Sequence, residues 1–488
     1  MDNPASYDHL YRRGAPWYLT RQLAEFHHLH REGHPFNIHE AEVNRTMMTY
    51  LLKKDFRLDV TFAEDRLTPA IPNRLRYILW IHKLLDSTTK NISHAYDPSR
   101  QVFGIDVGTG HCAIYSIMGC RVRPRWKFLG TDIDAQNIST ARETVKANNL
   151  EDRITIMETS ASESFFPMEK FPEHKYDFTM CNPPFYASID EMKKLLEEVD
   201  MDHESACTGS HVEMITPGGE LEFIKRMIDD SRAVGDRIQW FTTMIGQMRS
   251  VRPIIKYLQD KGMTNYAISC LQPHAEIKRP VIAWSWQDKR PPSDFARDLP
   301  NVEGKLQPPL SQFHLRLVPT AHTDDVIEFL NKELTSIAWF WEWDENLGVG
   351  VGYAETNAWG RVARRKAALS LSRTTSLTEI PKEVKFGVRI SVKEILVKKK
   401  GDTQNQDLAK RDSIEADDND VNSTIVNPSG LSGLETPTAS PNPSIDSSPD
   451  CYVQVTIQWN QGYEKHMDLF DSFLGMIRGR LDKTFGLC

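Results

Sequence analysis

The feature that most constrains the fold is a regular alternation of short apolar segments and helical segments that begins near residue 101. Apolar strands are predicted at 102–106, 126–132, 154–157 and 177–181. Helices are predicted between the first three of them, at about 112–118 and 135–148. Strands that alternate with helices in this order form a parallel sheet covered on both faces. We therefore expect a Rossmann-like α/β domain, with further helices at 39–55, 73–85, 218–232 and 251–261 and further strands at 238–245, 266–271 and 280–287.

The first predicted strand ends in a glycine-rich turn, Asp106-Val107-Gly108-Thr109-Gly110. Glycine lets the backbone adopt a positive φ and pass close to a ligand. Ligands of open α/β sheets bind at the carboxyl ends of the strands. Asp132 ends the second strand, 22 residues after Gly110, and a carboxylate at this place suits a ribose diol. An NAD site would typically carry a third glycine, at the position of Ala113.

The fourth predicted strand runs into Asn182-Pro183-Pro184-Phe185. Two prolines fix φ near −65° and remove two backbone donors, so the turn offers acceptors: the Asn182 side-chain oxygen and the Pro183 carbonyl. An amine on a planar ring needs two acceptors for its N–H groups and a flat surface, which Phe185 supplies. The turn resembles the catalytic tetrapeptide of S-adenosylmethionine (SAM)-dependent amino-methyltransferases; the alternative is a Pro-Pro turn after a core strand.

SAM carries a ribose, a sulfonium cation and an amino-acid tail, and each part needs a partner. We expect Asp132 to bind the ribose hydroxyls, and Asp106 either to hold the glycine turn or to bind the tail amine. Arg74 is a candidate for the tail carboxylate, although a single arginine on a helix is by default a surface residue. The seven cysteines show no metal-binding or disulfide spacing, so no metal site is expected.

The net charge of −8 is distributed unevenly. Segment 401–450 holds ten acidic residues against two basic ones, and its composition predicts a disordered insertion. Segment 361–400 holds twelve Lys and Arg against three Glu. Such a basic stretch indicates a polyanion partner; the alternative is a solvated face balanced by the acidic insertion. The candidate RNA-binding residues are Arg249, Arg252, Arg361, Arg364, Arg365, Lys366, Lys398, Lys399 and Lys400.

The chain divides into several predicted regions. An N-terminal extension (1–36), a candidate RNA contact, precedes the α/β domain (37–287). Five prolines in 288–310 predict a linker, and a smaller α/β unit follows over 311–488. That unit should contain strands at 313–318, 384–397 and 452–459 and helices at 324–336 and 466–481. Its tryptophans are either exposed RNA contacts or core residues: Trp339, Trp341, Trp343 and Trp359.

Four segments resemble the U6 small nuclear RNA (adenine-(43)-N(6))-methyltransferase family, which is related to bacterial 23S ribosomal RNA adenine-N6 methyltransferases. They are RLTPAIPNRLRYI at 66–78, GIDVGTG at 104–110, NPPF at 182–185 and GGELEF at 218–223. The resemblance covers about 55–287 and implies a class I SAM-dependent methyltransferase fold with a smaller C-terminal α/β accessory domain that binds RNA. It implies SAM ligands at Arg74, Gly108, Asp132, Asn182 and near Ser162. Close relatives carry glutamate at the position of Asp132, and the loop 158–175 departs more from them.

The resemblance further implies transfer of a methyl group from SAM to an extruded adenine of a structured RNA. U6 small nuclear RNA is the first expected target, and a SAM-synthetase messenger RNA is the second. Two other functions stay open: a protein glutamine N5-methyltransferase, and a non-catalytic RNA-binding protein with a relic SAM fold. The clusters Arg364-Arg365-Lys366 and Lys398-Lys399-Lys400 predict a nuclear location, with the cytoplasm also open.

Overall fold

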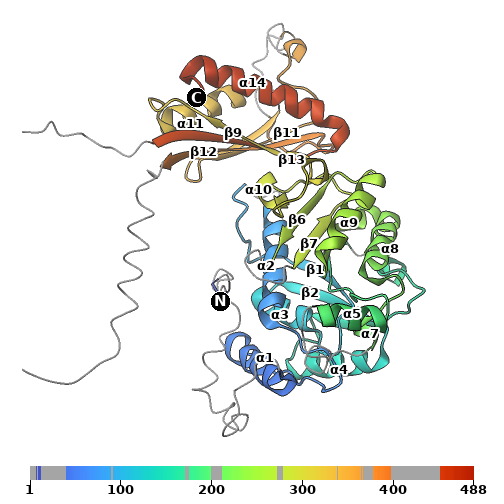
Figure 1. Cartoon of the computed structure of the whole chain (residues 1–488). Helices are drawn as coiled ribbons and strands as arrows, with labels where there is room; N and C mark the ends of the chain where they lie inside the picture. Colours follow the sequence, from blue (N-terminus) through green and yellow to red (C-terminus); the bar gives the residue numbers. More distant parts are fainter. Residues whose placement is uncertain are drawn as a thin grey trace, which may run out of the picture.

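The computed structural model contains two sheets, each with its own apolar core (Figure 1). The structure describes residues 7, 9–11, 40–89, 92–170, 175–198, 211–271, 279–337, 339–363, 365, 377–396 and 451–488. Arg364, Lys366, Lys398, Lys399, Lys400, the insertion 401–450 and most of the extension 1–36 lie outside the described residues. No helix in the described ranges has the length and apolar character that a membrane span requires.

The first sheet has the strand order β3-β2-β1-β4-β5-β7-β6-β8. Its strands are β1 (Val102–Val107), β2 (Trp126–Asp132), β3 (Ile154–Glu158), β4 (Tyr176–Cys181), β5 (Ile238–Met244), β6 (Tyr266–Cys270), β7 (Pro280–Trp284) and β8 (Arg297–Asp298). The first five strands in this order, β3, β2, β1, β4 and β5, are parallel to one another. Strand β7 runs antiparallel to both of its neighbours, β5 and β6. The chain order reverses between β1 and β4, and the carboxyl ends of strands at such a switch point frame a binding crevice.

Helices cover both faces of this sheet, as the alternating pattern predicts. One core layer joins the sheet to α1 (Ala41–Phe56), α2 (Ile71–Ser87), α3 (Ile114–Val122) and α4 (Ala135–Ala147). The other joins it to α8 (Gly219–Val234) and α9 (Met248–Asp260). The short helices α5 (Ile189–Glu198) and α7 (His211–Met214) lie between β4 and α8 in sequence. Every residue of β5 is buried, as expected for a central strand covered on both faces.

The described residues of the N-terminal extension pack against the first domain. The Tyr11 hydroxyl hydrogen-bonds to Asp55 at the end of α1. Arg76 Nη2 on α2 donates to the Tyr11 carbonyl at 2.8 Å, and the Tyr7 ring stacks on Phe56. These contacts hold Tyr7 and Tyr11 against α1 and α2.

The proline-rich segment 288–310 contains short elements rather than only extended chain. These are α10 (Ser293–Ala296), β8 and the 3₁₀ turn η6 (Gly304–Leu306), and β8 adds to the edge of the first sheet beside β6. The same segment bonds to the second sheet. Arg290 donates its backbone N–H to Asn460 O and its Nε to Gly462 O, both at 2.9 Å. Gly462 N in turn donates to Asp288 O at 2.8 Å, so the two units are joined by backbone hydrogen bonds.

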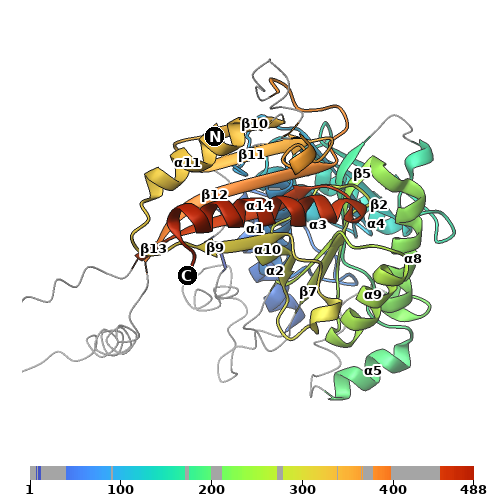
Figure 2. The same cartoon turned by 90° about the horizontal axis from the view of Figure 1, so that it is seen from above.

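The second sheet is antiparallel, with the strand order β10-β11-β12-β13-β9. Its elements are β9 (Gln312–Arg316), α11 (Thr323–Thr335), β10 (Phe340–Asp344), β11 (Val349–Ala354), β12 (Phe386–Leu396), β13 (Cys451–Gln461), η7 (Glu464–His466) and α14 (Met467–Phe485). Both long helices pack on one face of this sheet, and Figure 2 shows α14 lying across it.

Of the two interpretations of the four tryptophans in the second unit, burial in the core is the correct one for three. Trp339, Trp341 and Trp359 are buried, and Trp343 is half-buried. The rings of Trp339 and Trp341 stack with centroids 5.5 Å apart and lie over Gly352 and Gly350 of β11, where an added Cβ would stand 2.3 Å from a ring carbon. These side chains are core residues because the glycines leave room for them.

Candidate active site

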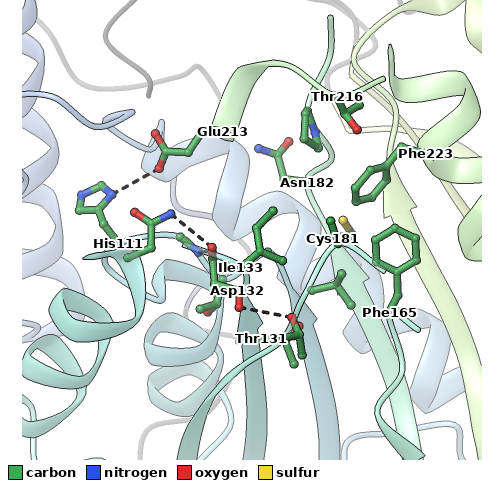
Figure 3. A pocket seen from close by; sticks show the side chains of 18 of the residues that line it. His111, Thr131, Asp132, Ile133, Phe165, Cys181, Asn182, Glu213, Thr216 and Phe223 are labelled. Carbon is green, nitrogen blue, oxygen red and sulfur yellow. Dashed lines mark hydrogen bonds and ion pairs between the residues drawn. The ribbon is translucent and has the colours of Figure 1, made fainter. Parts of the chain in front are cut away.

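A cavity of about 350 Å³ lies at the carboxyl ends of β1, β2 and β4 (Figure 3). This is the crevice expected at the switch point of the sheet, and its volume falls within the ~300–1,000 Å³ typical of small-molecule sites. Six residues predicted for the site line it: Arg74, Gly108, Gly110, Asp132, Asn182 and Pro184. Asp106, Ser162, Pro183 and Phe185 are not among its lining residues.

The glycine turn forms the floor of the cavity. Gly108 has φ +69° and Gly110 has φ +67°, values that favour glycine. A Cβ on Gly108 would meet no atom within 4 Å, so the space above this residue is open to a ligand.

Asp106 lies beneath the turn and is fully buried. Its Oδ2 accepts hydrogen bonds from Thr109 Oγ1 at 2.8 Å and Ser116 Oγ at 3.0 Å. Burial raises the pKa of Asp106 to about 6. Of the two roles predicted for this carboxyl, the contacts favour holding the turn, because the side chain ties it to the first helical residues of α3.

Asp132 stands in the wall of the cavity at the end of β2. Its Oδ2 accepts from Gly110 N at 2.9 Å, and its Oδ1 accepts from Asp134 N at 3.0 Å. Burial raises the pKa of Asp132, and these backbone hydrogen bonds oppose the rise. Asn137 Nδ2 also donates to Oδ1, at 3.4 Å, so both lone pairs of that oxygen are used. Oδ2 accepts one hydrogen bond and keeps a lone pair for a ligand hydroxyl.

An apolar slot lies beside Asp132. Ile133 lines the cavity with 49% of its surface exposed. Phe165 and Phe223 also line it, with ring centroids 4.5 Å apart. The loop that was predicted to supply a SAM ligand near Ser162 lines the cavity with Ser160, Ala161, Glu163 and Ser164. Ser162 itself does not line the cavity, and its hydroxyl lies 3.0 Å from Ser160 Oγ.

Arg74 reaches the cavity from α2 and is buried rather than a surface residue. Its guanidinium lies 5.3 Å from the centroid of the Tyr115 ring. Its Nε has no hydrogen-bond partner among the described residues. Buried polar groups are nearly always bonded, so an open donor on a buried cation indicates an anionic ligand such as a carboxylate.

Asn182 presents the complementary signal. Its Oδ1 is buried and has no hydrogen-bond partner in the described part of the chain, and Figure 3 shows its side chain among the residues around the cavity. Phe185 lies outside the cavity and is half-buried. Its ring rests on Gly246, where an added Cβ would stand 2.3 Å from Phe185 Cδ1. The turn therefore places an unpartnered acceptor at the wall of the cavity and an aromatic ring outside it.

Two segments distant in sequence hold this turn. Tyr186 N donates to Met214 O at 3.0 Å, and Thr216 N donates to Tyr186 O at 2.9 Å. Glu220 is buried and accepts from Gly246 N at 2.6 Å, Gln247 N at 3.1 Å and Ser250 Oγ at 2.6 Å. The GGELEF segment thus fixes the loop on which the Phe185 ring rests.

Sequence reasoning missed a second set of cavity residues. His111 and Glu213 both line the cavity, with His111 Nδ1 3.7 Å from Glu213 Oε1. Glu213 Oε2 accepts from Leu67 N at 3.1 Å. Residues 67, 111 and 213 are related by no spacing rule, and only the fold brings them together.

The predicted RNA-binding arginines have mixed surroundings. Arg249 and Arg252, on the first turns of α9, pair with Glu191 at 2.7 Å and with Glu303 at 2.6 Å, and their side chains are 61% and 65% exposed. Arg361 and Arg365 are exposed. Exposed ion pairs are weak, so these contacts do not exclude the predicted role of Arg249 and Arg252.

The cavity as a whole fits the predicted cofactor. Four groups surround one space: a buried cation with an unpartnered donor, a carboxylate that can accept from ribose hydroxyls, an apolar slot, and a glycine turn with open space above Gly108. These groups match the tail carboxylate, the ribose, the adenine and the close backbone approach that SAM requires.

Comparisons with known proteins identify the family of the chain. The chain matches a family model described as RNA methyltransferase over residues 20–288. The U6 small nuclear RNA (adenine-(43)-N(6))-methyltransferase of Schizosaccharomyces pombe is 32% identical over 334 residues, which cover 68% of this chain and 81% of that protein. The RNA N(6)-adenosine-methyltransferase METTL16 of Homo sapiens is 33% identical over 257 residues, which cover 52% of this chain and 44% of that protein.

The matched part spans about half the length of the Caenorhabditis relatives as well, at 52% and 54%. A solved structure of the hMettl16 catalytic domain in complex with MAT2A 3'UTR hairpin 1 is 30% identical, covers 57% of this chain and 93% of that chain, and has a TM-score of 0.48. The family match over more than half of the sequence and the similarity to the S. pombe enzyme show that this chain belongs to the RNA methyltransferase family and is a SAM-dependent enzyme.

Proposed function

We propose that this protein transfers a methyl group from SAM to N6 of an adenine in RNA, with U6 small nuclear RNA as its first target. The observation that carries the proposal is the buried, unpartnered Asn182 Oδ1 at the wall of the cofactor cavity. An unsatisfied acceptor of this kind costs about 1–3 kcal/mol, and a substrate N–H removes that cost on binding.

The residues of the chain divide the work of binding. Arg74 would bind the tail carboxylate of SAM, Asp132 the ribose hydroxyls, and Ile133 with Phe165 and Phe223 the adenine. SAM, when bound, supplies a methyl group attached to a positively charged sulfur.

The acceptor side is formed by the Asn182 turn. Asn182 Oδ1 and the Pro183 carbonyl would each accept one N6 hydrogen, which turns the nitrogen lone pair out of the ring plane. Phe185 would stack on the target base, which must leave its helix to reach this position. The methylated nitrogen loses one proton to solvent, so orientation and preorganised acceptors suffice for catalysis.

RNA is supported as the substrate by the family and by the relatives. The S. pombe relative is named for U6 small nuclear RNA, and the hMettl16 catalytic domain was solved with a MAT2A 3'UTR hairpin. The exposed arginines at the start of α9 provide cations for phosphates beside the turn. A protein glutamine substrate is not favoured, because the relatives act on RNA.

Methyl transfer from labelled SAM tests the proposal directly. The wild-type protein is offered a U6 RNA transcript, the same transcript with its candidate adenosines replaced, and a total protein fraction. We expect label in the first RNA alone. Asn182→Ala should abolish transfer while SAM affinity is largely kept. Label in protein, or full activity of Asn182→Ala, would refute the proposal.

Nuclear location is a further proposal, supported only by the clusters at 364–366 and 398–400. Imaging of a fluorescent fusion, with and without alanines in both clusters, tests it. A signal confined to the cytoplasm, with none in the nucleus, would contradict it.

A further inference from the structure

We propose that the Tyr77 hydroxyl is a positioning group for Asn182 and sets the rate of methyl transfer without touching cofactor or RNA. This inference rests on the proposed function. It arises from an irregularity at the end of β4, directly before the Asn182 turn.

Strand β4 leaves its neighbour β5 before it ends. The backbone pairing of these strands joins Tyr176 to Ile238 and Phe178 to Trp240. On the other side, β4 stays paired with β1 as far as Cys181, opposite Val107. The last residues of β4 therefore rely on side chains on their β5 side.

Hydroxyl groups fill this gap. Thr242 of β5 makes two hydrogen bonds to Thr179. Its Oγ1 lies 2.7 Å from the Thr179 carbonyl oxygen, and its N–H donates to Thr179 Oγ1 at 3.2 Å. The Tyr77 hydroxyl lies 2.6 Å from Thr242 Oγ1 and accepts from Cys181 N at 3.4 Å. Thr179, Thr242 and Tyr77 are fully buried, so no water can replace a lost bond.

The two backbone ends of this chain fix the direction of every proton in it. A carbonyl can only accept, so the Thr242 hydroxyl donates to Thr179 O. Thr242 Oγ1 must then accept from the Tyr77 hydroxyl, whose oxygen is left to accept the Cys181 N–H. Burial raises the pKa of Tyr77 far above its usual value, so this donor is never lost to ionisation near neutral pH.

The chain of bonds links the turn to the cofactor wall. Tyr77 sits one helical turn after Arg74 on α2, and its ring meets the Tyr115 ring edge-on with centroids 5.6 Å apart. Tyr115 lies beneath the Arg74 guanidinium. One helix thus carries the cation of the cofactor cavity and the hydroxyl that anchors Cys181, the residue bonded to Asn182. The expected result is a fixed distance between the cofactor and the amine acceptor.

Tyr77→Phe removes one oxygen and leaves the ring packing in place. A misplacement of about 1 Å can lower a rate by about a hundredfold, so we expect the kcat of Tyr77→Phe to fall by about tenfold to a hundredfold. The dissociation constant of SAM and the KM for RNA should change by no more than about twofold, because no group that contacts either ligand is altered.

Tyr266→Phe is the matched control. Tyr266 is also buried in the first domain, where its hydroxyl donates to Leu306 O at 3.1 Å and accepts from Gln259 Nε2 at 3.0 Å. It lies on β6, away from the cavity. Its variant should lose stability to a similar extent while kcat is kept.

Thr242 gives a second route to the same bonds. Thr242→Val interrupts the chain from β5 and should match Tyr77→Phe in kcat, and the double variant should be no slower than either single one. Thr242→Ser keeps the hydroxyl and should restore most of the rate. The Thr242 pair keeps the test decisive if Tyr77→Phe folds poorly.

Two results separate the possible failures. Absence of methyl transfer by the wild-type protein would refute the proposed function itself. If the wild type is active, two outcomes would overturn the positioning role alone. In the first, Tyr77→Phe and Thr242→Val are no slower than Tyr266→Phe. In the second, the SAM affinity of these variants falls in step with their kcat.

Discussion

Replacing Gly246 with alanine should slow methyl transfer while the cofactor cavity stays intact. A Cβ at this position would stand 2.3, 2.7 and 3.0 Å from three carbons of the Phe185 ring, whereas ordinary contact begins near 3.4 Å. The ring must therefore recede by about 1 Å, and a displacement of that size in a positioning group lowers rates by about a hundredfold. Overpacking should also destabilise the fold by about 1–3 kcal/mol.

The assay measures kcat with RNA, the dissociation constant of SAM and the thermal midpoint for the same preparation. Gly475→Ala serves as the control, because a Cβ there meets no atom within 4 Å and the residue lies in α14 of the second unit. That substitution should stabilise the helix slightly and leave kcat unchanged. If Gly246→Ala keeps kcat within about twofold of wild type, Phe185 does not support the target base and its proposed stacking role is wrong.

Three further outcomes are expected. Because the pKa of Asp106 is raised to about 6, the folded state binds its proton more tightly than the unfolded chain does. The stability that this proton supplies is complete below about pH 4 and is lost as pH rises through about 6, by roughly 3 kcal/mol; urea unfolding at several pH values should show this loss in the wild type and not in Asp106→Asn. Trp339→Ala should destabilise the second unit by about 3–5 kcal/mol in the same measurement, since the side chain is core, and an unchanged midpoint would contradict its burial. Arg249→Ala should leave the thermal midpoint nearly unchanged, weaken RNA binding, and reduce the slope of log Kd against log salt by about one; an unchanged slope would exclude a phosphate contact.

The strands and helices of the first sheet could be predicted because local patterns and global packing agree there. Strand β2 was predicted at 126–132 and is observed at Trp126–Asp132. In the second unit β10 and β11 were missed. Strand β11 reads Val-Gly-Val-Gly-Tyr-Ala, and alternating glycines weaken a strand signal. The glycines leave room for the rings of Trp339 and Trp341. This packing joins residues from separate segments, so no local sequence pattern contains it.

The candidate site shows the same division. Gly108, Asp132 and Asn182 follow strand ends, and parallel strands bring their carboxyl ends to one edge, so their common location could be inferred. The place of Glu213 in the cavity could not be inferred, because it depends on how the chain folds back after β4. In the structure the Glu213 carboxylate contacts both Leu67 N and His111 Nδ1. Phe185 shows the limit of a motif. It was predicted to supply the flat surface for the amine-bearing ring, but it is not among the residues that line the cavity, and its ring rests on Gly246.

The join between β12 and β13 has a practical consequence. Leu396, the last residue of β12, is paired with Cys451, the first of β13, so the 54 residues between them leave and return at neighbouring points. Replacing them with about four turn residues would lower the closure entropy by roughly 2 kcal/mol without asking any strand to move. The connection between β12 and β13 is thus a suitable insertion site, where a reporter domain or a segment of altered charge can replace the natural residues without a change in either sheet.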